Sequence, residues 1–205
     1  MCAAALLLGG CTGDADPIVT STPSPSPSVA AVDPSTSASP SASASPSPSA
    51  TALTEEEVLA AIPEDARSEG FISAVMFSRY FLELYGPMFA PPYDRGTFQS
   101  LSDDECDFCA SAVDSSASAE DAGTESRGAS ITWLDDAPVA QGGLREDGFW
   151  YITQRYELSP RAVLDSSGSE LSSDEGSRGR AGVKLGWSDG RWAVFGVEIE
   201  PDDAA

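Results

Sequence analysis

The stretch that decides the fold of this 205-residue chain reads Gly182-Val183-Lys184-Leu185-Gly186-Trp187-Ser188-Asp189-Gly190-Arg191-Trp192-Ala193-Val194-Phe195. Its Asp189-Gly190 pair favours a two-residue hairpin turn. Counting outward from this turn pairs Trp187 with Trp192 and Leu185 with Val194 on one face. We therefore expect two long antiparallel strands that meet at residues 189–190.

The second strand of this hairpin also carries large apolar side chains at alternate positions. Phe195, Val197 and Ile199 are expected together on the face opposite Trp192, because successive side chains of a strand alternate. Strands that are apolar on both faces are usually covered on both sides. The hairpin is therefore expected at the centre of its sheet, not at a solvated edge.

Further strands are expected between residues 123 and 182. Residues 130–134 form a short alternating segment, and residues 148–164 form a long one in which Phe149 and Tyr151 oppose Trp150 and Ile152. Pro160 lies inside the long segment and predicts a bulge or an edge there, because proline cannot donate to a strand ladder. Residues 166–178 are polar and glycine-containing, which predicts a mobile loop.

A long helix is expected at residues 71–85, which Gly86-Pro87 terminates. Its apolar side chains cover most of the circumference, so other structure should clasp it. Ordinary core packing explains these side chains best. The alternative is a cavity, whose candidate lining residues are Phe71, Val75, Met76, Tyr80 and Leu84 of the helix with Trp187 and Trp192 of the hairpin.

Shorter helices are expected around this one, at residues 54–61, after Pro63, at 93–101 and at 106–121. Helices that precede three to five antiparallel strands predict an α+β fold, in which N-terminal helices pack on a curved antiparallel sheet. Residues 54–205 are long enough for one such domain with a sizeable core.

Cys106-Asp107-Phe108-Cys109 has the spacing of a redox-active pair. Reactive thiols need nearby positive charge, whereas Asp103, Asp104, Glu105 and Asp107 surround this pair with negative charge. A structural disulfide that fixes a turn at the start of a helix is the favoured interpretation. A redox role and a zinc site stay open as alternatives.

The predicted domain is strongly acidic. All 11 basic residues of the chain and 30 of its 33 acidic residues lie beyond residue 53, which gives a formal charge of −19. This charge argues against nucleic acid and against anionic head groups as partners. Calcium ligands are conceivable in Asp103-Asp104-Glu105, Asp135-Asp136 and Asp174-Glu175, but none has the spacing of a calcium-binding loop, so a solvated surface is favoured and no metal or cofactor is expected.

The N-terminal region predicts export and a lipid anchor. Leu8-Gly9-Gly10-Cys11 follows a short apolar run and is typical of a bacterial lipoprotein signal, in which Cys11 is acylated after cleavage of residues 1–10. The absence of Lys and Arg before Arg67 indicates that the true start lies upstream of Met1. Residues 11–53 are rich in Ser, Pro and Ala and predict a disordered tether of about 40 Å as a coil and about 130 Å when extended. A bare spacer is favoured over a glycosylated stalk.

These features together resemble an uncharacterised family of actinobacterial lipoproteins, a domain of unknown function. The resemblance rests on the box at Cys11, the Ser/Pro tether, Tyr80-Phe81, Leu101-Ser102 before Cys106-Asp107-Phe108-Cys109, and Leu185-Gly186-Trp187 with Gly190-Arg191-Trp192, over about residues 63–199. The order of elements also resembles the nuclear-transport-factor-like (SnoaL-like) cone fold. The resemblance implies a cone-like core and supplies no catalytic residues.

Three functions are consistent with the sequence. The favoured one is a binding or scaffold module at the cell envelope, anchored in the lipid membrane through Cys11, which holds a small apolar ligand or an envelope protein. The second is a small enzyme, but the chain has no histidine, so acid–base chemistry would fall to an Asp or Glu beside Tyr80, Tyr85, Tyr151 or Tyr156. The third is a purely structural envelope component.

Overall fold

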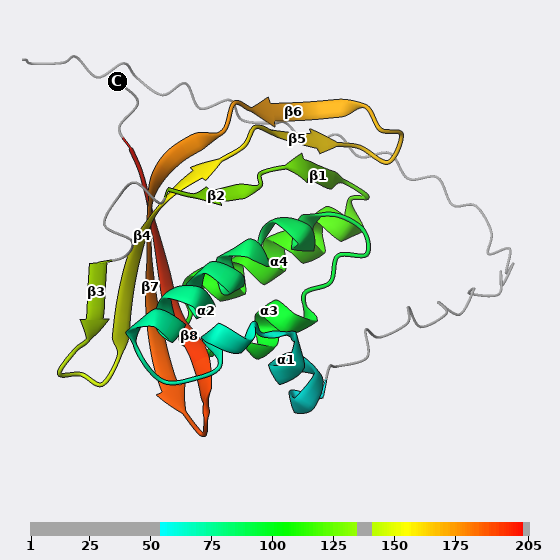
Figure 1. Ribbon diagram of the computed structural model, residues 1–205. Helices are drawn as coiled ribbons and strands as arrows, with labels where there is room; N and C mark the ends of the chain where they lie inside the picture. The colour runs from blue at the N-terminus through cyan, green and yellow to red at the C-terminus, as the bar shows by residue number, and fades with distance from the viewer. Residues whose placement is uncertain (1–53, 135–140, 203–205) are drawn as a thin grey trace, which may run out of the picture. The chain divides into compact units, whose positions relative to one another are not determined.

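The computed structural model describes residues 54–134 and 141–202, all of them within one compact unit (Figure 1). The helical elements are α1 (Glu55–Ala61), η1 (Glu64–Ala66), α2 (Phe71–Glu83), η2 (Gly86–Phe89), α3 (Gly96–Ser100) and α4 (Asp107–Asp121). The strands are β1 (Glu125–Gly128), β2 (Ile131–Trp133), β3 (Gln141–Leu144), β4 (Trp150–Leu158), β5 (Arg161–Leu164), β6 (Glu170–Asp174), β7 (Ser177–Ser188) and β8 (Arg191–Pro201).

Helices followed by antiparallel strands confirm the predicted α+β class. The predicted signal, Cys11, the tether and Asp135-Asp136 lie outside the described residues.

The hairpin forms around Asp189-Gly190 in the predicted register, with Trp187 opposite Trp192 and Leu185 opposite Val194. The prediction that Val197 and Ile199 lie on the face opposite Trp192 is wrong, however. The β7–β8 register shifts between Lys184 and Leu185, which leaves Phe195 as an extra residue in β8. One extra residue reverses the alternation of side chains beyond it, so Val197 and Ile199 join the helix-covered face opposite Val183 and Ala181.

The predicted central position of the hairpin holds for only one of its strands. The sheet order is β2-β4-β7-β8, with β3 also paired to β4, so β7 is internal and β8 is an edge strand. The segment after α3 covers that edge, because Val194 N donates to Leu101 O (2.9 Å) and Asp103 N donates to Val194 O (2.8 Å). These bonds satisfy backbone groups that an open edge would expose.

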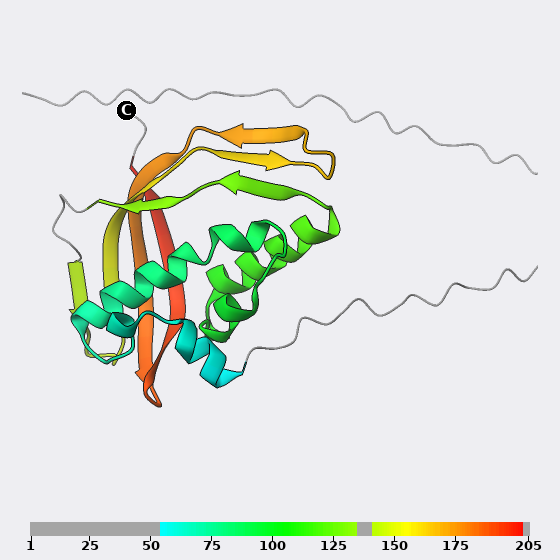
Figure 2. The same cartoon turned by 45° about the vertical axis from the view of Figure 1, so that its right-hand side comes forward.

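The sheet bends sharply along one line that crosses three pairs of strands. Along this line a short break separates β1 from β2, β4 from β5, and β6 from β7. Figures 1 and 2 show the strands turning over the helices there. The break between β4 and β5 falls at Ser159-Pro160, as proline predicted. Opposite it lie Gly128 and Gly176, each with a φ of +90° that favours glycine.

The prediction of a mobile loop at residues 166–178 is wrong. This segment contains β6 and the start of β7, and β6 pairs with β5 in the small sheet β1-β5-β6. All five side chains of β6 are exposed, so no apolar alternation marked the strand, which forms through backbone pairing with β5.

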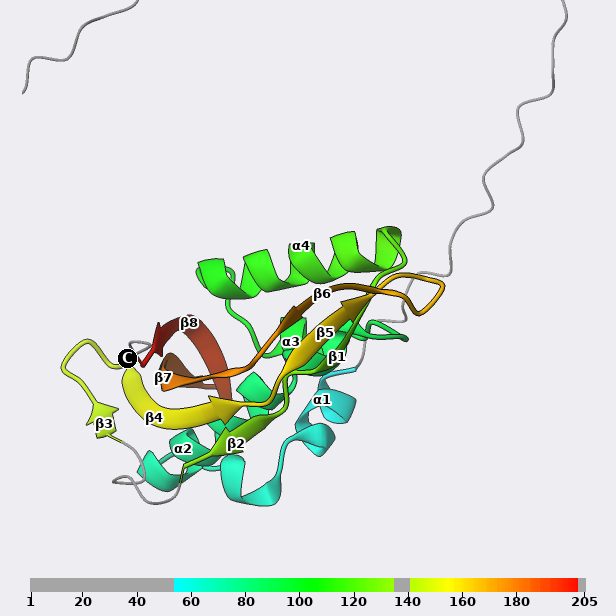
Figure 3. The same cartoon turned by 90° about the horizontal axis from the view of Figure 1, so that it is seen from above.

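Helices cover the concave side of the bent sheet (Figures 1 and 3). α2 contacts β4 and β7, and α4 contacts β8. α2 is clasped as predicted, since Phe77 and Phe81 are fully buried, while Ile72 on its outer side is 69% exposed. The Phe81 ring stacks on Phe98 of α3 at a centroid distance of 4.4 Å, which joins the two helices in one core.

Candidate functional site

A pocket of about 830 Å³ lies between the helices and the bend of the sheet. On the helical side its wall comes from the end of α2, from η2 and from the first turn of α4, including Leu82, Glu83, Tyr85, Pro87 and Phe108. On the sheet side every strand except β3 contributes, and the large apolar side chains there are Ile131, Trp133, Tyr156, Leu158 and Ile199. Most of this surface is apolar.

Strand register explains why these sheet residues converge. Trp133 lies opposite Tyr156, and Ile131 lies opposite Leu158. Directly opposed residues share a face of the sheet, so all four side chains point toward the helices. The bulge at Phe195 adds Ile199 to this face, where it lies opposite Ala181 at the pocket wall.

Buried polar contacts hold the helical wall in place. The hydroxyl of Ser116 on α4 is fully buried and donates to the carbonyl oxygen of Met88 in η2 (2.5 Å). The Tyr85 ring packs against Phe108 at a centroid distance of 5.7 Å. A buried hydroxyl without a hydrogen-bond partner would destabilise the folded state, so the bond from Ser116 to Met88 fixes η2 against α4.

A second polar network fixes α2 against β4 beside the pocket. Gln154 is 2% exposed; its Nε2 donates to the Ser78 hydroxyl (2.6 Å) and its Oε1 accepts from Arg79 Nε (2.6 Å). The Arg79 guanidinium also lies 5.4 Å from the centroid of the Trp133 ring. The network therefore orients Trp133, whose indole Nε1 donates to Glu83 Oε1 at 2.7 Å.

The remaining polar groups of the pocket belong to hydroxyls and one ion pair. Burial raises the pKa of the Tyr156 hydroxyl; a hydrogen bond with Ser177 opposes this shift and the charge of Asp202 adds to it. The phenol is therefore neutral at physiological pH and is able both to donate and to accept. Arg161 Nη2 and Asp174 Oδ2 pair at 2.6 Å at the pocket wall.

None of the seven predicted cavity residues lines this pocket. Val75 is buried in the core, and Phe71, Met76, Tyr80 and Leu84 are partly buried against it. Trp187 and Trp192 line a different hollow of about 360 Å³ near the hairpin turn, together with Leu59 and Ile62. The helix was predicted correctly, but its apolar pattern does not reveal which part of it faces the bend. Pro160 predicted a break in the strand, but nothing in the sequence predicted a pocket beside that break.

Glu83, Tyr85 and Tyr156 line the same pocket, but within the described residues no hydrogen bond joins Glu83 to either tyrosine hydroxyl. No described Asp or Glu side chain is buried. In these same ranges, the one hydrogen bond between a tyrosine hydroxyl and a carboxylate joins Tyr151 to Asp147 (2.8 Å) at the exposed turn between β3 and β4. Hydrogen bonds from Phe149 N and from the Tyr151 hydroxyl lower the pKa of Asp147. The hydrogen bond between Tyr151 and Asp147 also raises the pKa of Tyr151. Both shifts oppose proton transfer from the tyrosine to the carboxylate.

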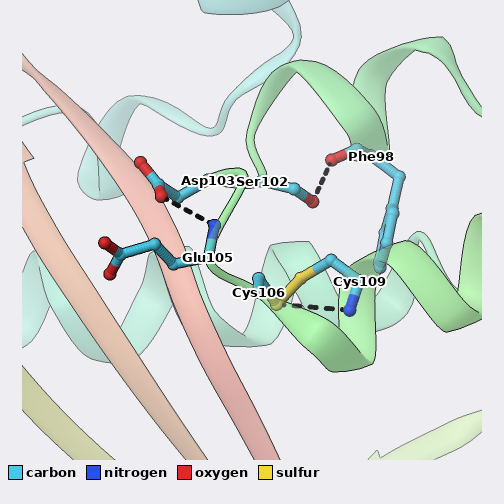
Figure 4. Close-up of a disulfide and its surroundings, with 6 residues drawn as sticks. All are labelled: Phe98, Ser102, Asp103, Glu105, Cys106 and Cys109. Carbon is cyan, nitrogen blue, oxygen red and sulfur yellow. Dashed lines mark hydrogen bonds between the residues drawn. A yellow bond between two sulfur atoms is a disulfide. The ribbon is translucent and has the colours of Figure 1, made fainter.

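Cys106 and Cys109 form a disulfide, which confirms the favoured interpretation of this pair (Figure 4). Both residues are buried, at 1% and 2% exposure. Cys106 is the N-cap of α4, since its Sγ accepts from Cys109 N (3.2 Å). The pair therefore fixes the start of the helix that supplies Phe108 to the pocket.

Two of the acidic candidates for calcium, Asp103 and Asp174, have other partners in the structure. Asp103 Oδ1 accepts from Glu105 N (3.0 Å), and Asp174 pairs with Arg161. Within residues 54–134 and 141–202, no three potential metal ligands come together. No helix in these ranges is long and apolar enough to cross a membrane.

The fold and the site define an α+β domain with an apolar pocket in the bend of its sheet. No family model matches the chain, and neither does any curated protein. Similar solved structures include the intermembrane space region of the chloroplast protein ARC6, with a TM-score of 0.46 and 13% identity, covering 60% of this chain and 89% of that one.

Two further structures show weaker similarity. Aln2 from a Streptomyces species has a TM-score of 0.38 and 13% identity, covering 62% of this chain and 88% of that one. A protein of unknown function with a cystatin-like fold from Nostoc punctiforme has a TM-score of 0.34 and 6% identity, covering 67% of this chain and 96% of that one. Similarity at this level supports no conclusion about activity or ligand.

Proposed function

We propose that this protein is a lipid-anchored, extracytoplasmic binding module whose pocket holds a small, largely apolar ligand. The observation that carries the proposal is the pocket of about 830 Å³, whose wall is mainly apolar with a few hydroxyl groups. Pockets that bind small molecules have volumes of about 300–1,000 Å³ and this same mixture of apolar surface and few polar groups. We also propose that the bent sheet and its helices are the cone-like core of the lipoprotein family that the sequence resembles.

The location rests on the sequence. Acylation of Cys11 would anchor the chain, and residues 12–53 would hold the acidic domain away from the lipid surface. A single acyl chain gives only weak membrane attachment, so stable anchoring takes the more extensive modification that lipoprotein signals direct.

The binding proposal is tested by filling the pocket. The protein for this test is the full chain with Cys2→Ser and Cys11→Ser, which prevents acylation. Ile199 is 43% exposed at the pocket wall, so Ile199→Trp adds bulk there. Leu171→Trp is the matched control, because Leu171 is 59% exposed on β6 and does not line the pocket.

Titration with an environment-sensitive apolar dye measures the outcome. We expect saturable binding to the parent protein and to Leu171→Trp, and binding weakened about tenfold or more in Ile199→Trp. Equal dye affinity in the two variants would show that the pocket is not the binding site.

The anchor is tested by growing cells that express the full-length chain with radioactive palmitate. The wild-type chain should be labelled and recovered with membranes, and Cys11→Ser should be unlabelled. An unlabelled wild-type chain in the soluble fraction would remove the anchor from the proposal.

A further inference from the structure

The pocket carries an excess of negative charge. Its charged lining residues are Glu83, Asp174 and Arg161. Arg161 and Asp174 neutralise each other, because the guanidinium Nη2 and Nε both donate to one carboxylate oxygen, at 2.6 and 3.1 Å. Within the described residues Glu83 forms no ion pair. Among these residues its carboxylate accepts only the Trp133 indole N–H, which leaves its other oxygen open to a ligand.

Aromatic rings form the walls beside this carboxylate. Tyr85 and Phe108 pack together on the helical side, and Trp133 and Tyr156 are neighbours on the sheet side. The faces of such rings carry partial negative charge and attract cations, and the indole of tryptophan does so most strongly. Trp133 already makes one such contact with the Arg79 guanidinium, which lies outside the pocket lining and is held by Gln154.

The charge of the whole domain acts in the same direction. Residues 54–205 carry a formal charge of −19, so the surrounding potential attracts positive solutes and repels anions. An apolar pocket with aromatic walls and one carboxylate that forms no ion pair within the described residues fits a molecule with an apolar body and one positive charge.

We infer that the pocket selects ligands that carry an ammonium group on an apolar body, with Glu83 and Trp133 receiving the ammonium end. This inference rests on the proposed binding function and specifies its ligand class. The apolar body fills the space between Leu82, Leu158 and Ile199, and the cation lies at the edge of the pocket where Glu83 meets solvent.

A matched set of probes that share a decyl chain tests the inference: decyltrimethylammonium, decanol and decanoate, each below its micelle concentration. The protein is the full chain with Cys2→Ser and Cys11→Ser, and binding is measured by isothermal titration calorimetry. We expect decyltrimethylammonium to bind about tenfold more tightly than decanol, and decanoate to bind most weakly. The preference should weaken as salt rises.

Variants separate the role of Glu83 from general attraction to an acidic protein. Glu83→Gln keeps the oxygen that accepts the Trp133 N–H and removes the charge. It should weaken decyltrimethylammonium binding about three- to tenfold and leave decanol binding unchanged. Glu198→Gln removes the same charge from an exposed position outside the pocket lining and should change neither affinity.

The outcomes distinguish the two proposals. Equal affinities for decanol and decyltrimethylammonium, or an unchanged cation affinity in Glu83→Gln, would overturn the ligand class, while loss of decanol binding in Ile199→Trp would still support the pocket as the site. Failure of every probe to bind, or binding that Ile199→Trp leaves intact, would overturn the binding function itself.

Discussion

Gly128 lies at the bend of the sheet, and Gly148 lies in the turn between β3 and β4. Gly128 and Gly148 both have positive φ values, of +90° and +83°. A Cβ on Gly128 would meet the backbone carbonyl of Pro160, whereas a Cβ on Gly148 would meet nothing within 4 Å. The two positions therefore separate the strain of a positive φ from the steric requirement of the bend.

We predict that Gly128→Ala lowers the free energy of unfolding by about 3 kcal/mol or more, since backbone atoms of the paired strand cannot move aside. Gly148→Ala should cost only about 1–2 kcal/mol, from the backbone conformation alone. Urea unfolding of both variants measures the difference. Equal losses would mean that the strands tolerate a side chain at the bend.

Asp165 determines part of the acid stability of the chain. Hydrogen bonds from the Ser167 hydroxyl and the Ser169 amide lower the pKa of its carboxyl group in the folded state. A group with a lowered folded-state pKa stabilises the protein above the ordinary aspartate range, and this contribution is lost as the pH falls through that range, near about 4.

We predict that Asp165→Asn flattens the fall in stability below about pH 4, since it removes one of the groups that must be protonated. Unfolding midpoints measured from neutral to acid pH provide the comparison. Asp114→Asn, at an exposed position of α4, is the control for a lost charge. An acid slope identical to that of the parent protein would contradict the assignment.

At the scale of elements, α4 depends on Cys106 in two ways. Cys106 closes the disulfide with Cys109, and its sulfur caps the helix. The replacement Cys106→Ser with Cys109→Ala removes the disulfide and keeps a capping oxygen. The replacement of both cysteines by alanine removes the disulfide and the cap.

Both double variants should lose about 2 kcal/mol from the short disulfide loop in the chain-entropy model. The alanine pair should lose about 1 kcal/mol more, because an N-cap hydrogen bond is missing. Thermal unfolding under identical conditions compares them. Equal stabilities would show that the cap does not contribute.

Element types and turn positions were predictable where local chemistry decided them. Asp189-Gly190 predicted the hairpin, and Pro160 predicted a strand break. The bulge at Phe195 was missed although the apolar alternation changes phase there, from Trp192 and Val194 to Phe195, Val197 and Ile199, because this pattern was interpreted as a strand with two apolar faces. β6 was missed because its side chains are exposed and its pairing uses only backbone groups.

At the scale of the whole molecule, a cavity between the long helix and the concave sheet was expected only under the binding hypothesis, and its position was not predicted. The position depends on how three strand breaks align across the sheet and on the face reversal that brings in Ile199. The alignment of the breaks depends on long-range strand pairing, which no local pattern encodes. Trp187 and Trp192, the candidate cavity residues near the hairpin turn, therefore line a different hollow from the pocket.

The central claim is that small molecules bind in the bend of the sheet. An amide NMR titration of the full chain carrying Cys2→Ser and Cys11→Ser with decanol tests it most directly. We predict saturable shift changes concentrated at residues 130–133, 156–159 and 176–181, with none at residues 187–192. Shift changes centred on residues 187–192, or no saturable change at the bend, would contradict the account.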